Sequence, residues 1–105
     1  MITVTIYKHS NQYKGFRCEG HAGYAEEGYD IVCAAVSVLT VNTVNSIETF
    51  TEDAFSGEEK NGFITCKLTG SVSKETALLM DSMVLGLTSI QENYDNYMQL
   101  RFKEV

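Results

Sequence analysis

The most apolar run of this sequence begins at Ile31 and extends to the neighbourhood of Phe50. Its composition and length predict a helix. In the first half of the run, apolar side chains fall on every side of that helix, whereas the second half is mixed. A helix that is apolar all round is buried on more than one side. A small two-layer domain covers only one side, so we expect the other side to need a partner. Self-association is the simplest choice.

Four further segments alternate apolar and polar residues with the two-residue period of strands that have one covered face. These segments are Ile2–Tyr7, Tyr13–Gly20, Phe63–Thr69 and Tyr97–Lys103. In addition, Asp53–Gly57 is predicted to form a short edge strand, which pairs with Phe63–Thr69 through a turn at Glu58–Gly62. We therefore expect these five segments to be strands.

The first two strands are predicted to form an antiparallel hairpin, because turn-forming residues at His9–Gln12 separate them. We expect His9 to be an exposed turn residue. The alternation places Cys18 on the inner face of the second strand, and it places Cys66 on the inner face of Phe63–Thr69. Both are predicted to be buried thiols, because cysteine is among the most buried residue types.

A second helix is predicted after Ser73, which is a suitable N-cap residue. Glu75 in its first turn is favoured by the helix dipole. Apolar residues spaced by three and four then form a stripe, and the helix ends near Tyr94. The stripe consists of Met80, Met83, Val84, Leu87 and Ile90. We interpret its methionines as core residues rather than as a binding groove.

The predicted element order is therefore β-β-α-β-β-α-β. Clean alternation in the strands favours a mainly antiparallel sheet with one covered face. Two amphipathic helices on that face give a two-layer α+β sandwich. The 105 residues contain no repeat, linker or low-complexity tract, so we expect a single domain over residues 1–105.

The net charge of −6 argues against a nucleic-acid partner, which requires a basic face. The distribution of charge is uneven: from Cys18 to Glu59 the sequence has nine acids and no Lys or Arg. This acidic half has two interpretations. It is either an ordinary solvated surface or a surface that attracts a basic partner.

The cysteine pattern and the N-terminal segment indicate the cellular compartment of the protein, which we expect to be the cytoplasm. No two of the three cysteines have the spacing of a zinc knuckle or a redox pair, so we expect thiols in a reducing environment. The N-terminal segment alternates like a strand and lacks the pattern of a signal peptide. No run is expected to be long enough to span a membrane. We therefore expect a cytoplasmic protein that needs no membrane, metal or cofactor.

One His and one Cys flank a glycine-containing loop directly before the apolar helix. His21 ends the second strand, and Cys33 lies at the start of the helix. With Asp30 as the N-cap, Cys33 falls at the third helical position. There the helix dipole lowers a thiol pKa, and unpaired backbone N–H groups can bind an oxyanion. A thiolate is the nucleophile, and His21 can act first as its base and then as an acid. This pattern indicates a cysteine acyl-transfer enzyme.

Each of these residues also has a structural interpretation. Cys33 can be a packing residue of an apolar helix, and His21 can be an ordinary surface residue. Asp30 is first of all a cap, although it can also orient His21. Ser37 lies one turn after Cys33 on the same face, and it hydrogen-bonds either near the site or back to the helix backbone. A zinc site made by His21, Cys33 and Cys18 would need a fourth ligand, and Cys18 is predicted to point elsewhere.

The loop between the two candidates is the predicted substrate-binding segment. Its glycines and its lack of apolar periodicity indicate a mobile loop. Its two tyrosines either contact the substrate or belong to a lid that packs on itself. The segment includes Ala22, Gly23, Tyr24, Glu26, Glu27, Gly28 and Tyr29.

Two elements of this stretch closely resemble the signature of the ribosomal-processing cysteine proteases, the Prp family. They are Gly20-His21-Ala22-Gly23-Tyr24 and Asp30-Ile31-Val32-Cys33-Ala34-Ala35-Val36-Ser37. A short acidic loop joins them, and the length and element order agree over the whole chain. The resemblance implies that His21 and Cys33 form a catalytic dyad, with Asp30 and Ser37 as supporting residues.

The resemblance also implies a substrate. Members of this family remove the short N-terminal extension of ribosomal protein twenty-seven of the large subunit, which allows ribosome assembly. They are homodimers, and the loop between His and Cys is expected to order over the substrate. This sequence is thus expected to encode a cysteine endopeptidase that acts on a ribosomal protein precursor and has no direct nucleic-acid partner.

Two other functions are compatible with the residues alone. The first is a non-enzymatic, acidic, ribosome-associated binding protein in which Cys33 is a core residue. The second is a thiol hydrolase or transferase for small molecules, which would have a deep apolar pocket instead of an open groove.

Overall fold

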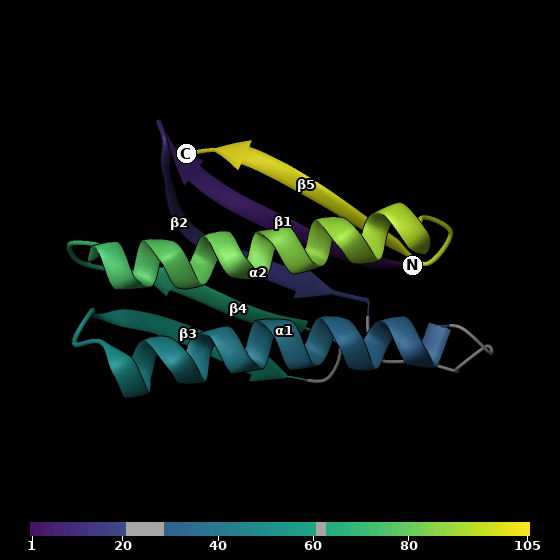
Figure 1. Ribbon diagram of the computed structural model, residues 1–105, viewed down its shortest axis with the longest axis horizontal. Coiled ribbons are helices and arrows are strands. Elements are labelled where there is room, and N and C mark those ends of the chain that lie inside the picture. The colour runs from purple at the N-terminus through teal and green to yellow at the C-terminus, as the bar shows by residue number, and fades with distance from the viewer. Residues whose placement is uncertain (21–28, 61–62) are drawn as a thin grey trace.

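The computed structural model describes residues 1–20, 29–60 and 63–105. These residues form five strands and two helices in the predicted order β-β-α-β-β-α-β (Figure 1). The elements are β1 (Ile2–His9), β2 (Gln12–Glu19), α1 (Tyr29–Phe50), β3 (Phe55–Lys60), β4 (Phe63–Leu68), α2 (Lys74–Asn93) and β5 (Met98–Glu104).

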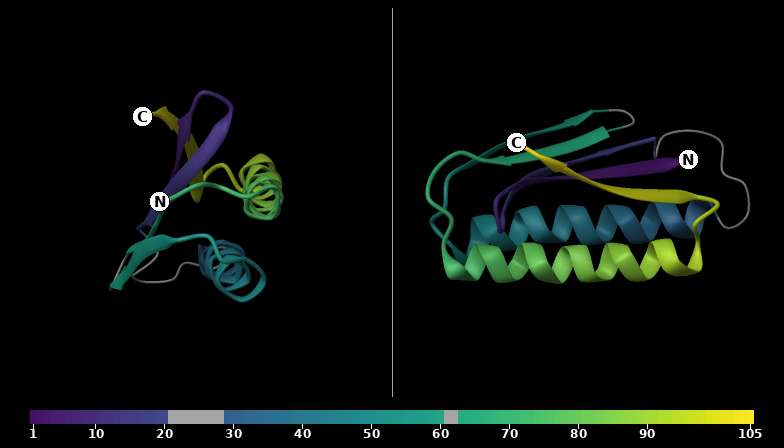
Figure 2. Two further views of the ribbon diagram at one scale, coloured as in Figure 1. Left: turned by 90° about the vertical axis from the view of Figure 1, so that its left-hand side faces the viewer. Right: turned by 90° about the horizontal axis from the view of Figure 1, so that it is seen from above.

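The strands form one sheet in the order β3-β4-β2-β1-β5. The pairs β1–β2, β2–β4 and β3–β4 are antiparallel, whereas β1–β5 is parallel. The parallel pair arises because α2 returns the chain to the end of the sheet where β1 starts, and the N–H of Ile2 donates to the carbonyl of Tyr97 over 2.8 Å. Both helices lie side by side on one face of the sheet (Figure 2). The predicted two-layer α+β sandwich with a mainly antiparallel sheet is confirmed.

The core lies between the sheet and the two helices. The inward positions of β1 follow the predicted alternation, and Cys18 and Cys66 are buried as expected. Four of the five residues in the predicted α2 stripe are buried, and Ile90 packs against them. The fully buried side chains include Ile2, Val4, Ile6, Phe16, Val32, Val36, Ile47, Met80, Met83, Leu87 and Met98.

Close contact between the helices depends on Gly86 of α2. A Cβ at this position would lie 2.9 Å from Cδ1 of Leu39 on α1, so the absent side chain makes room for Leu39. Two threonines of α1 are also buried. The hydroxyl of Thr40 donates to the Val36 carbonyl over 2.9 Å, and the hydroxyl of Thr43 donates to the Leu39 carbonyl over 2.7 Å. Their burial is therefore compensated by hydrogen bonds.

Ser73 caps α2 as predicted, because its hydroxyl oxygen accepts from the N–H of Thr76 over 3.2 Å. Asp53 anchors this cap: its Oδ2 accepts from both the N–H and the hydroxyl of Ser73, each over 2.8 Å. Hydrogen bonds from Thr76 and Ser73 hold the pKa of the Asp53 carboxyl below its usual value. The segment before β3 is thus tied to the start of α2.

Three predicted boundaries are corrected by the structure. The helix α1 begins at Tyr29, so Tyr29 is helical rather than part of the loop, and Asp30 is the second helical residue rather than the N-cap. The edge strand is Phe55–Lys60, and it continues through most of the expected Glu58–Gly62 turn, whose last two residues lie outside the described ranges. In the hairpin, the predicted turn His9–Gln12 is too long: His9 is the last residue of β1 rather than a turn residue, and it pairs with Gln12, the first residue of β2. His9 is exposed as predicted, and its Nδ1 lies 2.8 Å from the carbonyl oxygen of Val105.

One expectation about hydropathy is wrong. Residues Ile31–Phe50 are long and apolar enough, by length and composition, to cross a membrane. Core helices meet the same criterion, and α1 packs Val32, Val36 and Ile47 into the core.

The face of the helices turned away from the sheet is apolar and exposed. On α1, Ile31 and Val38 are 61% and 67% exposed; on α2, Leu78 and Leu85 are 68% and 70% exposed. Within each helix these two residues are seven apart, so they lie on one side. The expectation that one apolar side of α1 lies uncovered by the domain itself is confirmed.

Candidate active site

Cys33 is the fifth residue of α1, and its side chain is half-buried against the core. The earlier helix start moves it two positions further into the helix than predicted. The first four N–H groups of a helix lack intrahelical partners, so these groups precede Cys33 along the chain. The thiol thus lies at the N-terminal end of α1, just beyond the first turn.

His21 lies outside the described residues, as do residues 22–28 of the predicted loop. The backbone of Tyr29 and Asp30 is described as helix, but their side chains are not. The structure therefore does not test whether His21 meets Cys33, and both the dyad and the orienting role of Asp30 stay predictions.

Gly20 is the last described residue before His21. It has a φ of +90°, a conformation that suits glycine. A Cβ on Gly20 would lie 2.3 Å from the carbonyl oxygen of Met1, so the backbone here lies directly against the start of the chain. This contact fixes the backbone at the end of the described segment that precedes His21 in the sequence.

The thiols of Cys18 and Cys33 come from two different elements, β2 and α1, and interact. The pKa of Cys18 is raised to about 12, first by burial and then by the charges of Cys33 and Glu19. Burial alone raises the pKa of Cys66 to about 11. Two of the three cysteines are thus held as neutral thiols inside the core, and Cys33 is the one near the surface.

Ser37 follows Cys33 by one turn and is also half-buried. Its backbone carbonyl accepts from the hydroxyl of Thr40 over 3.3 Å. Because both residues belong to α1 and are four apart, Ser37 lies on the same side of the helix as Cys33. Among the described residues, no cluster of three or more His, Cys, Asp and Glu side chains could hold a metal ion.

The chain is similar to known proteins over nearly its whole length. The family model described as "Cysteine protease Prp" matches residues 1–99. The ribosomal processing cysteine protease Prp of Staphylococcus aureus is 29% identical, with 98% of this chain and all of the relative aligned. The protein of the same name from Bacillus subtilis is 28% identical over 95% of this chain and 96% of the relative.

Solved structures agree with the fold. The S. aureus ribosomal processing protease Prp in complex with a substrate peptide has a TM-score of 0.92 at 27% identity, over 98% of this chain and 100% of that one. The same protease with a covalently linked product peptide has a TM-score of 0.87 at 28% identity, over the same shares. The SMU.848 protein of Streptococcus mutans has a TM-score of 0.90 at 29% identity, over 100% and 96%.

Proposed function

This chain belongs to the cysteine protease Prp family, and we propose that it removes the N-terminal extension of ribosomal protein twenty-seven of the large subunit, which allows ribosome assembly. It is a cysteine protease for ribosomal processing, as its relatives are named. This assignment replaces the alternative of a non-enzymatic binding protein. The S. aureus structures with substrate and product peptides support a peptide substrate.

The observation that carries the proposed site is the different burial of the three cysteines. Cys18 and Cys66 are buried and their pKa values are raised, so neither is suited to be a nucleophile at neutral pH. Cys33 is half-buried and lies at the N-terminal end of α1, one short segment after His21. Cys33 is therefore the proposed nucleophile.

In the proposed reaction, His21 takes the proton of the Cys33 thiol, and the sulfur attacks the carbonyl carbon of the scissile peptide bond. The C–N bond breaks, His21 returns the proton to the leaving amine, and a thioester with Cys33 remains. Water, deprotonated by His21, then attacks the thioester carbonyl. The C–S bond breaks, which releases a carboxylic acid and restores the thiol.

The proposed oxyanion donors are the backbone N–H groups of the first turn of α1, residues 29–32, since these precede Cys33 and lack intrahelical partners. Asp30 is the second helical residue, and a negative charge there is favourable at a helix N-terminus. We propose that Asp30 supports the site by stabilising the N-terminus of α1. Ser37, one turn after the thiol, is the proposed supporting residue on the C-terminal side of Cys33.

The proposed recognition of the substrate is partly electrostatic. The segment between His21 and Cys33 contains Glu26, Glu27 and Asp30, and no Lys or Arg lies between Cys18 and Glu59. A ribosomal protein's N-terminal segment is basic, so these acids would attract it. We propose that the segment between His21 and Cys33 orders over the bound substrate peptide and excludes other peptides from the site.

We further propose that the enzyme is a cytoplasmic homodimer. The exposed apolar residues Ile31, Val38, Leu78 and Leu85 form the helix face, which is the surface turned away from the sheet. Burying this face against a second copy would remove apolar area from water. Because Ile31 lies two residues before Cys33, the dimer contact would adjoin the site.

The proposed function is tested with a peptide that spans the cleavage junction of the precursor. Wild type should cleave it, and Cys33→Ala should not, while Cys18→Ala keeps cleavage because Cys18 is a core thiol. His21→Ala should also abolish cleavage. A folded wild type with a reduced Cys33 that leaves the peptide intact would contradict the proposal.

A further inference from the structure

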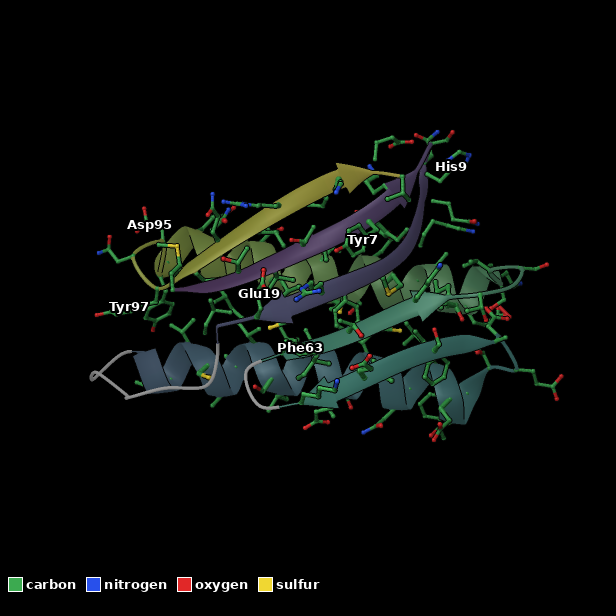
Figure 3. The ribbon with its side chains drawn as sticks, turned by 180° about the vertical axis from the view of Figure 1, so that it is seen from behind. Tyr7, His9, Glu19, Phe63, Asp95 and Tyr97 are labelled. Carbon is green, nitrogen blue, oxygen red and sulfur yellow. The ribbon has the colours of Figure 1, made fainter. Side chains whose placement is uncertain are left out.

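None of the described helices or strands covers the face of the sheet opposite the helices, and the outward side chains of that face form three rows across the strands. We call this surface the open face; Figure 3 shows it with Tyr7, Glu19 and Phe63 labelled. The strand register defines the rows. The first row is Glu58, Thr65, Arg17, Thr5, Arg101; the second is Ser56, Lys67, Gly15, Tyr7, Lys103; the third is Lys60, Phe63, Glu19, Thr3, Gln99.

The open face is positively charged, although the chain as a whole is acidic. Its three rows hold five of the eight basic residues and two of the fourteen acids, a net charge of +3. The rest of the chain then holds three basic residues and twelve acids, a net charge of −9. The fold thus gathers positive charge on the open face and leaves the negative charge on the rest of the molecule, although the net charge of the whole chain is −6.

The two acids of the open face are already paired. Glu19 lies 3.3 Å from Arg17, and Glu58 lies 3.2 Å from Lys60. The second row contains no acid, and its Lys67 and Lys103 are exposed. The excess positive charge therefore concentrates along this row and its neighbour Arg101.

A hollow of about 530 Å³ opens in the middle of the open face. It forms where Gly15 interrupts the second row between Lys67 and Tyr7. A side chain cannot replace this glycine, because a Cβ would lie 2.3 Å from the carbonyl oxygen of Cys66. The residues that line the hollow include Tyr7, Lys14, Arg17, Lys67, Glu58 and the buried Phe16. The hollow thus combines the Tyr7 ring with three cations and with one acid, Glu58, that is paired with Lys60.

Aromatic rings alternate with cations elsewhere on the open face as well. The Arg17 guanidinium lies 5.1 Å from the centre of the Phe63 ring, and the Lys60 ammonium lies 6.0 Å from it. A sheet face with interleaved rings and cations suits a single strand of RNA, whose bases stack on the rings while its phosphates contact the cations. An acidic peptide would satisfy the cations but would leave the rings and the hollow without planar partners.

We propose that the open face binds single-stranded RNA, with one nucleotide in the hollow beside Tyr7 and its flanking phosphates on Lys67 and Lys14. A single strand is required, because bases must be unstacked to lie on the sheet. Cys33 does not lie on this surface, since it is part of the helix that covers the opposite face of the sheet.

The test measures the fluorescence anisotropy of a labelled RNA strand of about 12 nucleotides, a length suited to one small binding face. Wild type should bind at about 50 mM salt and lose affinity steeply towards about 200 mM. Lys67→Glu should weaken binding at least about tenfold and lower the slope of log affinity against log salt by roughly 0.7. Lys74→Glu on α2 makes the same charge change away from the open face and should change affinity less than about twofold.

A second variant pair tests the ring contact. Tyr7→Leu should weaken binding several-fold while keeping the salt slope, and Tyr94→Leu at the end of α2 should leave binding unchanged. Peptide cleavage by Lys67→Glu should equal that of wild type, which separates this proposal from the protease assignment. The proposal is overturned if no RNA binds at about 50 mM salt, or if Lys74→Glu weakens RNA binding as much as Lys67→Glu does. It is also overturned if poly-glutamate or duplex RNA competes as well as unlabelled single-stranded RNA, or if Lys67→Glu abolishes peptide cleavage.

Discussion

Cys18 on β2 is a buried neighbour of Cys33 on α1, and the charge of Cys33 contributes, after burial, to raising the pKa of Cys18 to about 12. The core thus contains a thiol that stays protonated directly beside the thiol proposed to react. This contrast predicts how the three cysteines differ in reactivity.

Iodoacetamide at neutral pH should modify Cys33 before Cys18 or Cys66. Only the thiolate reacts, and the raised pKa values of the two buried cysteines leave almost none of it. Mass spectrometry of tryptic peptides over a time course measures the three rates. In urea, which exposes all three, the rates should converge. Equal rates in the folded protein would count against Cys33 as the nucleophile.

Gly15→Ala should destabilise the protein by about 2–4 kcal/mol, because the added Cβ would lie 2.3 Å from the backbone carbonyl oxygen of Cys66. Gly70→Ala is the matched control. Its Cβ would lie 3.9 Å from the Ala54 side chain, an ordinary contact, and it should change stability by less than about 0.5 kcal/mol. Urea denaturation measures both. Similar effects of the two substitutions would show that β2 and β4 do not approach as closely as described.

Asp53 should make stability depend on pH in the acidic range. Its pKa is lower in the folded protein than its ordinary value of 3.8, because Thr76 and Ser73 hydrogen-bond to the ionised carboxylate. Its contribution is therefore fully present above the unfolded-state pKa and is lost as pH falls through the folded-state pKa.

The measurement compares the free energy of unfolding of wild type and Asp53→Asn between about pH 6 and pH 2. Wild type should be the more stable at the upper end, and the difference should shrink as pH falls below the unfolded-state value. A difference that stays constant over the range would mean that Asp53 does not stabilise the cap of α2 through its charge.

Much of the fold was predictable, because periodicity is a local property of the sequence. Alternation identified the inward positions of β1, β2 and β4, including Cys18 and Cys66, and the Ser73 cap followed from residue type. The strand β3 was placed wrongly at its ends. Its side chains are mostly exposed on both faces, so no burial pattern marks where this edge strand begins or stops.

Other features depend on contacts between distant segments. The predicted start of α1, Ile31 after an Asp30 N-cap, lies two residues after the observed start at Tyr29, since Asp30 before an apolar run has the composition of a cap whether or not the helix begins earlier. The parallel pairing of β1 with β5 depends on how α2 returns the chain.

The positive charge of the open face likewise comes from the register of strands far apart in sequence. Of the candidate site, Cys33 and Ser37 lie on one side of α1 as predicted, and His21 lies outside the described residues.

Val38→Glu or Leu85→Glu should convert the proposed dimer to a monomer, because each would place a charge in the middle of the apolar helix face. Phe102→Glu is the control: Phe102 is also apolar and exposed, but it lies on β5, away from this face. Sedimentation equilibrium measures the mass of each. A wild type that sediments as a monomer, or a Phe102→Glu that dissociates as readily as Val38→Glu, would contradict the assignment of the interface.

The most direct test of the proposed catalysis is cleavage of the junction peptide by wild type, Cys33→Ala and Cys18→Ala, with circular dichroism to verify that each is folded. We predict that Cys33→Ala has no detectable cleavage and retains its fold. Cys18→Ala should lose stability by roughly 1–3 kcal/mol through its cavity and still cleave at a temperature where it is folded. Cleavage by folded Cys33→Ala at the wild-type rate would contradict the role of Cys33 as the nucleophile.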